Sequence, residues 1–414
     1  MILLEVNMEG ETPYFIPVEQ AKEISQQITL HHQKEYVSLD DAHGRILFED
    51  LSPLIDDPAF DNSSMDGWAV IHSDTLSSSN EKPILLQISG MVQAGLSENE
   101  LSVTSGNAIK IMTGAPIPKG ADSIIQVECT RDNEDGTVSI FEPSKPHFIR
   151  HKAENLAIGK AALFAGNILT PDRVGLCATM GHKEIPVVKK MKIAIISTGD
   201  ELILPGNPIK FGQIYESNSF GIVGLIRWLG HDAIRFPSVA DTLETLRTSL
   251  NNAAKETDLI LTTGGVSMGE FDLVRNIMEN EGEIKFWRVR IRPGSPPIFG
   301  TWKGTPIWGL PGNPVSSHVV FRMLVAPWIR NSTGAEGPIE QPIRVLLKDS
   351  VKAMKDGLTL RRLVIENSDE GLIGRVKTHQ GSGNLNSLAI ADALTLLPPG
   401  SSCNEGDWVD AILL

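Results

Sequence analysis

Hydrophobic and polar positions follow two different periods along the chain, and the change between them marks its parts. From Met191 onward, short apolar runs alternate with segments in which apolar residues return every three or four positions. The first pattern predicts buried strands and the second predicts amphipathic helices. The expected strands are 192–197, 233–236, 259–262, 286–291 and 306–308, and the expected helices are 217–229, 241–254, 272–281 and 315–329. Strands that alternate with helices predict a doubly wound, mostly parallel α/β sheet covered on both faces.

The rest of the chain is divided into shorter elements. Residues 14–50 have a mainly helical pattern, and a proline- and aspartate-rich stretch follows. Short strand-like runs and turns then fill the chain as far as residue 148, and alternation of apolar and polar residues returns after residue 340. The pattern therefore predicts four domains: a mixed α/β linker domain formed by 14–55 and 149–185, a β-rich inserted domain over 56–148, an α/β domain over 186–333, and a C-terminal small, β-barrel-like domain over 340–414.

The composition is that of a folded, soluble protein, because 41% of the 414 residues are hydrophobic and 21% are charged. The chain is too long for one ordinary core, so roughly three or more domains are expected. The formal net charge of −14 argues against nonspecific binding to nucleic acid and does not favour an anionic membrane. An acidic chain that binds an anion must gather its cations locally.

Three features indicate a reducing, cytoplasmic compartment. Cys129, Cys177 and Cys403 are far apart and odd in number, so neither structural zinc nor a disulfide framework is expected. The amino terminus carries acidic residues and no basic start, which is unlike a signal peptide. No apolar run approaches the ~20 residues that span a bilayer.

Four loops follow predicted strands of the α/β domain: Thr198–Glu201, Gly264–Asp272, Arg292–Ser295 and Leu310–Pro314. In an open α/β sheet, ligands bind outside the carboxyl ends of the strands. Glycines there permit positive φ and close approach of the backbone, as phosphate-binding loops require. One such loop is usually only a tight turn, but four at one edge favour a binding site.

The last of these loops also predicts the start of a helix. Asn313 is a strong N-cap residue and Pro314 suits the first helical turn. We therefore expect a helix that begins with free N–H groups and the positive end of its dipole facing outward, ready for an anion.

Cations precede the Arg292 loop. Arg288, Arg290 and Arg292 alternate with apolar residues, so a regular strand would place all three guanidinium groups on one face. An exposed edge strand with solvated arginines is the alternative. Because the strand runs into Pro293 and Gly294, we favour recognition of an oxyanion, which arginine binds in bidentate fashion.

Acidic residues stand beside these loops, namely Asp200, Glu201, Asp241, Glu270 and Asp272. Each has a structural alternative, since acids at helix starts act as caps or complement the helix dipole. For Asp241 alone we favour the cap, because the segment from Asp241 to Glu244 matches a capping box. Together, however, the acids suit Mg²⁺, which takes one or two carboxylates along with phosphate oxygens. They could also position a water or oxyanion nucleophile.

Two segments of the inserted domain stand out, Asp61–Trp68 and Lys110–Pro116. Both contain ordinary turn signals, but a tight turn does not need the Asn62, Met65 and Thr113 side chains. Common motifs are absent from the sequence: there is no Walker A loop, strand-linked dinucleotide fingerprint, zincin helix or serine-hydrolase elbow.

Taken in order, five strings of the chain resemble the molybdopterin molybdenumtransferase family, to which the carboxyl-terminal half of gephyrin also belongs. These strings are Asp61–Val70, Ile111–Pro116, Ser197–Leu202, Gly264–Glu270 and Leu310–Ser316. The resemblance implies an elongated homodimer with four domains per subunit. It also implies an Mg²⁺-dependent transferase that takes molybdopterin-AMP and molybdate, inserts the metal at the dithiolene and releases AMP.

The resemblance also assigns roles to residues. Asp66 and Thr113 are expected as catalytic residues that face the α/β domain of the other subunit. Glu201, Asp241 and Asp272 are expected as catalytic acids and metal ligands. Ser382, with either Arg361 or Arg362, is expected near molybdate. The full set of expected binding residues, from loops and resemblance together, is Gly199, Asp200, Gly264, Gly265, Ser267, Arg288, Arg290, Arg292, Pro311, Gly312, Asn313, Pro314, Ser316, Arg361 and Ser382.

One position departs from the family, which commonly has a lysine where this chain has Ser295. We expect Arg290 to compensate for that missing charge. Two other functions stay open: a molybdopterin adenylyltransferase or nucleotide-processing enzyme on the same α/β domain, and a non-enzymatic scaffold like gephyrin. A molybdopterin-adenylating enzyme and molybdoenzyme acceptors are possible partners, and tungstate is not excluded as the metal source.

Overall fold

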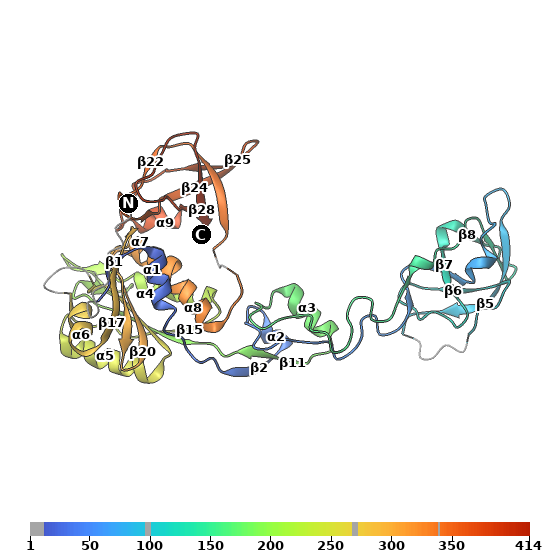
Figure 1. The fold of residues 1–414 in the computed structure, drawn as a ribbon, viewed down its shortest axis with the longest axis horizontal. Helices are drawn as coiled ribbons and strands as arrows, with labels where there is room; N and C mark the ends of the chain where they lie inside the picture. The colour runs from blue at the N-terminus through green and yellow to red at the C-terminus, as the bar shows by residue number, and fades with distance from the viewer. Residues whose placement is uncertain (1–11, 96–100, 267–271, 338–339) are drawn as a thin grey trace, which may run out of the picture. The chain divides into compact units, whose positions relative to one another are not determined.

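The computed structural model describes residues 12–95, 101–266, 272–337 and 340–414 (Figure 1). These residues form two compact units. The first, here called the α/β unit, comprises Met1–Glu35, Gly44–Ile46 and Val188–Leu414, and the second, the β-rich unit, comprises Tyr36–His43 and Leu47–Val187. Each unit is described separately.

A seven-stranded sheet forms the centre of the α/β unit, with strand order β1-β17-β19-β20-β16-β12-β15. Its strands are β1 (Tyr14–Ile16), β12 (Lys192–Ser197), β15 (Asp232–Arg235), β16 (Leu259–Thr263), β17 (Glu283–Val289), β19 (Ile298–Trp302) and β20 (Thr305–Leu310). Neighbours are parallel except at β19, which runs antiparallel to both β17 and β20. The mostly parallel sheet is therefore as predicted, although β19 was not recognised in the sequence.

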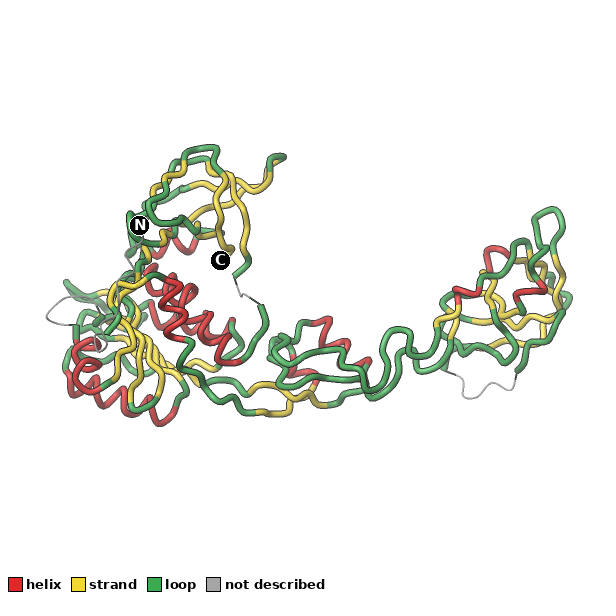
Figure 2. The backbone as a smooth tube through the Cα atoms, viewed as in Figure 1, coloured by secondary structure: helices red, strands yellow, loops and turns green. Residues whose placement is uncertain are grey.

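Helices cover both faces of this sheet (Figure 2). Along β12, Ile193 and Ile195 belong to one core and Ala194 and Ile196 to the other, as the two-residue period of a strand requires. Residues of α5 and α6 pack with the second core, and residues of the remaining helices pack with the first. The helices are α1 (Val18–Ser25), α4 (Asn218–Trp228), α5 (Leu243–Glu256), α6 (Leu273–Glu281), α7 (Pro314–Val320) and α8 (Ala326–Thr333), with a π-helical turn over Phe321–Val325.

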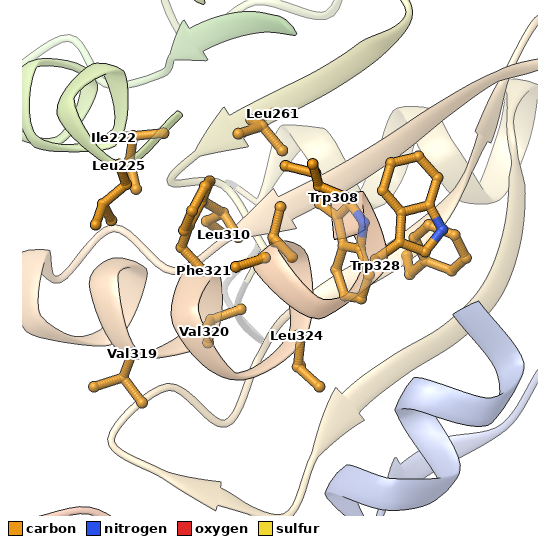
Figure 3. Close-up of a cluster of buried hydrophobic side chains, with 14 of the residues drawn as sticks. Ile222, Leu225, Leu261, Trp308, Leu310, Val319, Val320, Phe321, Leu324 and Trp328 are labelled. Atoms are coloured by element: carbon orange, nitrogen blue, oxygen red, sulfur yellow. The ribbon is translucent and has the colours of Figure 1, made fainter. Parts of the chain in front are cut away.

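Aromatic side chains fill the first core (Figure 3). The rings of Phe299 and Trp308 lie 4.5 Å apart between centroids, and Trp328 packs against Phe299 at 6.2 Å. Burying an aromatic or aliphatic side chain of this size stabilises the fold by about 1.5–3 kcal/mol. The indole N–H of Trp328 also donates to the carbonyl oxygens of Ser25 and Ile28, at 3.0 and 3.1 Å. Trp328 thus ties the end of α1 to α8.

Residues 14–35 pack with the α/β unit rather than with the other residues of the predicted linker domain. Residues 14–35 were assigned to the linker domain, yet β1 pairs in parallel with β17, with Tyr14 opposite Trp287. The expected mainly helical stretch 14–50 contains only α1 and the short α2 (Leu39–Ala42). A three-residue edge strand leaves too little local pattern to be recognised, because its pairing partner lies far along the chain.

The C-terminal part of the α/β unit contains a closed barrel, which confirms the predicted small β-barrel-like domain. Its strands are β21 (Pro342–Leu347), β24 (Arg362–Ser368), β25 (Gly371–Arg375), β26 (Ala393–Thr395) and β28 (Trp408–Leu413). The α/β unit also contains short elements outside the large sheet and the barrel. These are the strand pairs β22 (Val351–Lys352) with β27 (Ser402–Cys403), β18 (Ile291–Arg292) with β23 (Leu358–Thr359) and β13 (Leu202–Ile203) with β14 (Ile214–Tyr215), and helix α9 (Leu385–Ala389). The pairing of β18 with β23 attaches the arginine-bearing loop to the segment before β24.

The β-rich unit contains a six-stranded sheet of order β7-β4-β6-β5-β9-β8. Its strands are β4 (Gly67–Val70), β5 (Ile84–Val92), β6 (Asn107–Ile111), β7 (Ser123–Gln126), β8 (Thr130–Asp132) and β9 (Thr137–Ile140). The remaining elements are β2 (Lys34–Ser38), β3 (Asn62–Ser63), β10 (Ile149–Arg150), α2, α3 (Pro171–Thr179) and β11 (Glu184–Val188). Within the described ranges, no helix combines the length and apolar character needed to cross a membrane.

Two glycines of α4 are expected to respond in opposite ways to alanine. A Cβ at Gly221 would lie 2.4 Å from His318 Nε2, whereas a Cβ at Gly224 meets nothing within 4 Å. Gly221→Ala should therefore lower stability by about 1–3 kcal/mol through overpacking. Gly224→Ala should raise it by about 0.5–1 kcal/mol through helix propensity. Urea unfolding of both variants checks this, and equal effects would contradict the close packing of α4 on α7.

Candidate active site

Three of the four predicted loops line one cavity of about 720 Å³, here called the polar cavity. They are the segments 198–201, 264–265 and 311–314, which follow β12, β16 and β20. Because these strands are parallel, their carboxyl ends meet at one edge of the sheet and bring the loops together. Two residues predicted in the second loop, Ser267 and Glu270, lie outside the described residues.

Glycine is required at two points of these loops. Gly264 has φ +95°, and a Cβ there would lie 2.9 Å from the Thr198 carbonyl oxygen. Gly199 has φ +145°, and a Cβ there would lie 2.6 Å from Glu201 Oε2. The positive φ expected from the sequence is therefore present in both loops, and the Glu201 carboxylate folds back over Gly199.

Four acidic residues line the polar cavity: Glu201, Glu216, Asp241 and Asp272. The backbone N–H of Asp241 donates to Asp200 Oδ1 at 3.0 Å, so Asp200 positions Asp241 and does not itself line the cavity. Burial raises the pKa of Asp241, and the negative charges of Asp200 and Glu201 raise it further, against the effect of the Asp200 hydrogen bond. The sheet edge therefore holds a carboxylate in a position where ionisation is disfavoured.

Asp241 does not cap its helix, which corrects the sequence prediction. Helix α5 begins at Leu243, and its cap is Thr242, whose hydroxyl oxygen accepts from the Thr245 N–H at 3.3 Å. The capping box was placed one residue too early, because threonine and aspartate are both good caps. Asp272 stands at the cap position of α6 but makes no capping hydrogen bond with its side chain.

Within the described part of the chain, no three acidic, histidine or cysteine side chains are grouped so that they could hold a metal ion by themselves. Mg²⁺ does not require such a group, because it is usually bound by one or two carboxylates plus phosphate oxygens and water. Glu201, Asp241 and Asp272 line the same cavity and offer hard oxygen donors of that kind.

Residues before α4 also line the polar cavity, and the sequence did not single them out. Glu216 is only 2% exposed and accepts hydrogen bonds from the Ser197 hydroxyl at 3.1 Å and from Ser219. The Asn218 side-chain amide donates to the Gly312 carbonyl at 2.7 Å, which holds the loop before α7. The position of Glu216 and Asn218 at the start of a predicted helix could have indicated a binding role. The predicted loops were selected by their glycines, and this segment has none.

The fourth loop lines a neighbouring cavity of about 570 Å³, here called the guanidinium cavity. Arg288, Arg292 and Arg361 line it, together with Ser295 and Ser382. Pro296, Asn313 and Ser316 line both this cavity and the polar cavity, so the two adjoin. The predicted loops therefore converge on two connected spaces rather than on one.

The row of three arginines expected from a regular strand is not present. Strand β17 ends at Val289, and Arg288 has φ +64°, which interrupts the two-residue alternation. Arg290 donates from Nε to the Phe15 carbonyl at 2.7 Å and is not among the residues that line the guanidinium cavity. The expectation that Arg290 replaces the family's lysine is therefore not supported by its position.

Arg361, and not the expected Arg290, is the third arginine that lines the guanidinium cavity. Burial lowers its pKa, and the charge of Arg292 lowers it further. Of the two alternatives left open by the sequence, Arg362 is buried and donates to the Gly381 carbonyl at 3.2 Å. Burial lowers the pKa of Arg362 to about 10. Arg362 thus stabilises the loop that carries Ser382, while Arg361 lines the cavity and donates from Nη2 to the Lys352 carbonyl at 2.9 Å.

The helix that begins at α7 differs in two respects from its prediction. Asn313 is the cap residue and Pro314 the first helical residue, as expected. However, the first-turn N–H of Val315 is not free, because it donates to the Ser382 carbonyl at 3.1 Å. The helix also does not run regularly to residue 329, since the π-helical turn separates α7 from α8. The helix start therefore joins the α/β sheet to the C-terminal segment.

Asp66 and Thr113 lie together in the β-rich unit. Asp66 precedes β4 and Thr113 follows β6, and these strands pair with Gly67 opposite Ile111. The backbone N–H and the hydroxyl of Thr113 both donate to Asp66 Oδ1 at 2.7 Å. The backbone hydrogen bond and then the hydroxyl hold the pKa of Asp66 below its ordinary value. The pair presents an exposed, ionised carboxylate in a fixed orientation.

Three regions of the chain match known families. Residues 16–181 match the MoeA N-terminal region (domain I and II), 194–331 match a probable molybdopterin binding domain, and 344–414 match the MoeA C-terminal region (domain IV). The fold and the two cavities thus define a multidomain protein built around an α/β domain of the probable molybdopterin-binding type.

Over most of its length the chain is similar to proteins named molybdopterin molybdenumtransferase. It is 38% identical to that of Haemophilus influenzae over 75% of each chain, and 33% identical to that of Bacillus subtilis over 98% of this chain and 95% of the relative. The chain belongs to the molybdopterin molybdenumtransferase family. A crystal structure of a molybdopterin biosynthesis moeA protein from Pyrococcus horikoshii is also similar, with 29% identity, a TM-score of 0.84, and coverage of 97% of this chain and 100% of that one.

Proposed function

We propose that this protein is a transferase of molybdenum cofactor biosynthesis that inserts molybdate into adenylylated molybdopterin and releases AMP. One observation carries the proposal: a cavity lined by glycine loops and carboxylates adjoins a cavity lined by three guanidinium groups. The first suits the phosphates of molybdopterin-AMP, and the second suits a tetrahedral dianion. Names of relatives that are similar over most of the chain support the same activity.

In the polar cavity, the chain's own groups bind and orient the phosphates. The loops at Gly199 and Gly264 let the backbone approach a phosphate closely. Glu201, Asp241 and Asp272 are the residues that would hold Mg²⁺, which supplies neutralisation of phosphate charge when it is bound. Pro311 and Gly312 line the same wall, and the hydrogen bond from Asn218 holds them in place.

In the guanidinium cavity, Arg288, Arg292 and Arg361 bind molybdate, because planar guanidinium groups suit oxyanions. Ser295 and Ser382 line the same cavity. Since Asn313 and Ser316 line both cavities, molybdate is held beside molybdopterin-AMP. Such placement makes the reaction effectively unimolecular, and the fixed charges act where negative charge develops.

The two alternative functions are not favoured. An adenylyltransferase or nucleotide-processing enzyme on the α/β domain does not account for residues 16–181, which match the MoeA N-terminal region. A scaffold without activity does not account for Asp241, a cavity-lining residue whose ionised form is disfavoured by burial and by the charges of Asp200 and Glu201. Either would be supported if the chain were inert with molybdopterin-AMP, molybdate and Mg²⁺.

The setting of the reaction is also proposed. The protein acts as a homodimer in the cytoplasm, with Asp66 and Thr113 of one subunit completing the cavities of the other. A molybdopterin-adenylating enzyme supplies the substrate and molybdoenzymes accept the product. The direct test incubates the purified chain with molybdopterin-AMP, molybdate and Mg²⁺ and follows AMP release and formation of cofactor that activates an apo-molybdoenzyme. A rate of AMP release that depends on neither molybdate nor Mg²⁺ would contradict the proposal. Replacing molybdate with tungstate tests which metal the protein inserts.

Arg361→Gln is expected to weaken molybdate binding by about 10–100-fold, because one charge-assisted hydrogen bond contributes about 1.5–3 kcal/mol. Arg290→Gln is the matched control, since Arg290 donates to the Phe15 carbonyl and is not a lining residue. Calorimetric titration with molybdate measures both variants. A larger loss at Arg290 than at Arg361 would show that Arg290 does replace the family's lysine.

A further inference from the structure

A third charged cavity, of about 380 Å³, lies apart from the two described above and is lined by different residues. Its charged lining residues are Lys22 of α1, Arg322 of the π-helical turn, Arg330 of α8, and Glu340 just before the barrel. Three cations therefore face a single carboxylate, in a chain whose formal net charge is −14. Such a local excess of positive charge is the mark of an anion site in an acidic protein.

The two arginines of this cavity are poorly compensated, whereas Lys22 Nζ already forms an ion pair with Glu19 at 3.0 Å. Arg322 Nη1 is buried and makes no hydrogen bond among the described residues, and the same holds for Glu340 Oε1. Arg330 is 8% exposed, and its Nε donates to the Gly337 carbonyl at 2.8 Å, a neutral acceptor. Leaving a buried donor or acceptor unpaired costs about 1–3 kcal/mol, and more for charged groups. A ligand that pairs with both orphaned atoms would remove that cost.

The backbone around Arg322 is also unusual. The π-helical turn Phe321–Val325 interrupts an otherwise continuous helix, and Pro327 follows it. Proline has no N–H to donate to the carbonyl of Met323, four residues earlier, so the regular helical bond cannot form there. Turns of this kind within α-helices occur frequently at functional sites. The turn places Arg322 on the wall of the cavity, where its guanidinium also lies 5.1 Å from the Trp228 ring.

The two orphaned atoms define the ligand. Arg322 is a donor and requires an anionic oxygen. Burial raises the pKa of Glu340, and the charges of Arg322, Arg330 and Lys22 act against that shift. In its ionised form Glu340 is an acceptor and requires a hydrogen. Hydrogen phosphate offers both, through its oxyanion oxygens and its P–OH group. Sulfate and molybdate carry no proton near neutral pH, so Glu340 would repel them. A phosphate monoester, with a second pKa of about 6, also largely lacks that proton above pH 7.

We propose that Lys22, Arg322, Arg330 and Glu340 form a binding site for hydrogen phosphate that is distinct from the molybdate-binding guanidinium cavity. Glu340 makes the site selective for a protonated tetrahedral oxyanion. The proposal does not depend on the transferase activity, because no residue that lines this cavity also lines the polar cavity or the guanidinium cavity.

Calorimetric titration at pH 7.5 with inorganic phosphate, sulfate and glycerol phosphate tests the proposal. It is performed on the full chain carrying Arg361→Gln, so that oxyanion binding in the guanidinium cavity is weakened. Phosphate should bind at least about tenfold more tightly than the other two anions. Adding Arg322→Gln should lower phosphate affinity by about tenfold or more, and adding Glu340→Gln should raise sulfate affinity, because an amide can donate where the carboxylate cannot.

Location is checked by tryptophan fluorescence. Phosphate should change the emission of the chain, and Trp228→Phe should remove that change, because Trp228 is the ring beside Arg322. Lys22→Gln is the milder variant if Arg322→Gln fails to fold, as judged by circular dichroism, and it should weaken phosphate binding in the same direction. The proposal is overturned if phosphate does not bind, if sulfate binds equally well, or if neither Arg322→Gln nor Lys22→Gln alters the phosphate affinity.

Discussion

Asp241→Asn is expected to lower the rate of AMP release by about 100-fold or more while leaving the fold intact. The carboxylate lines the polar cavity together with Glu201 and Asp272, where loss of one preorganised charged group commonly costs 10²–10³ in turnover. Stability should not fall, because burial and the charges of Asp200 and Glu201 disfavour the ionised form in the folded chain. Steady-state AMP release and urea unfolding measure the two properties separately.

Thr242→Ala is the matched control, because it removes the residue that does cap α5. That variant should lose about 1 kcal/mol of stability and keep most of its activity. The reverse outcome is a stable and active Asp241→Asn with an inactive Thr242→Ala. It would show that Asp241 has only a structural role, as the sequence first suggested. The pair therefore separates a cavity carboxylate from a helix cap one residue away.

The pH dependence of turnover has a definite sign. The pKa of Asp241 is raised from its ordinary value, so this carboxylate is protonated at a higher pH than an ordinary aspartate. If its ionised form is required, activity is lost as pH falls through that raised pKa. Stability changes in the opposite sense: a raised carboxyl pKa favours the folded chain below the unfolded-state pKa, and this contribution is lost as pH rises through the folded pKa.

Local pattern was sufficient for the part of the site built by the parallel strands. The apolar runs before Thr198, Gly264 and Pro311 predict strands, and parallel strands end at one edge, so their loops meet without further information. The same reasoning explains why Gly199 and Gly264 were correctly expected to have positive φ. Sequence order and strand geometry together fix these positions.

What local pattern could not give depends on contacts between distant segments. Arg361 reaches the guanidinium cavity because β23 pairs with β18, a pairing that only the folded chain reveals. Arg290 is drawn away by the Phe15 carbonyl, which belongs to an edge strand too short to be recognised. Arg288 has a left-handed φ, and an arginine in the sequence does not indicate that backbone conformation.

Mixing two inactive variants tests whether the active site is shared between subunits. In the proposed homodimer, Asp66→Ala should inactivate both sites, because Asp66 is the common acceptor of both Thr113 hydrogen bonds and presents an ionised carboxylate. A heterodimer of Asp66→Ala with Asp241→Asn, isolated by two affinity tags, would contain one site with both defects and one intact site. Its AMP release should therefore be about half that of the unmodified dimer, given closed two-fold symmetry.

The control places both substitutions in one subunit and pairs it with an unmodified subunit. If Asp66 serves the partner's cavities, each site of this heterodimer carries one defect, and the dimer should be nearly inactive. If instead each site is formed within one subunit, the expected activities are reversed. The control then keeps about half of the activity, and the first heterodimer has almost none. Because both heterodimers contain the same two substitutions, differences in folding or metal content cannot produce that contrast, and only the origin of the Asp66 carboxylate can.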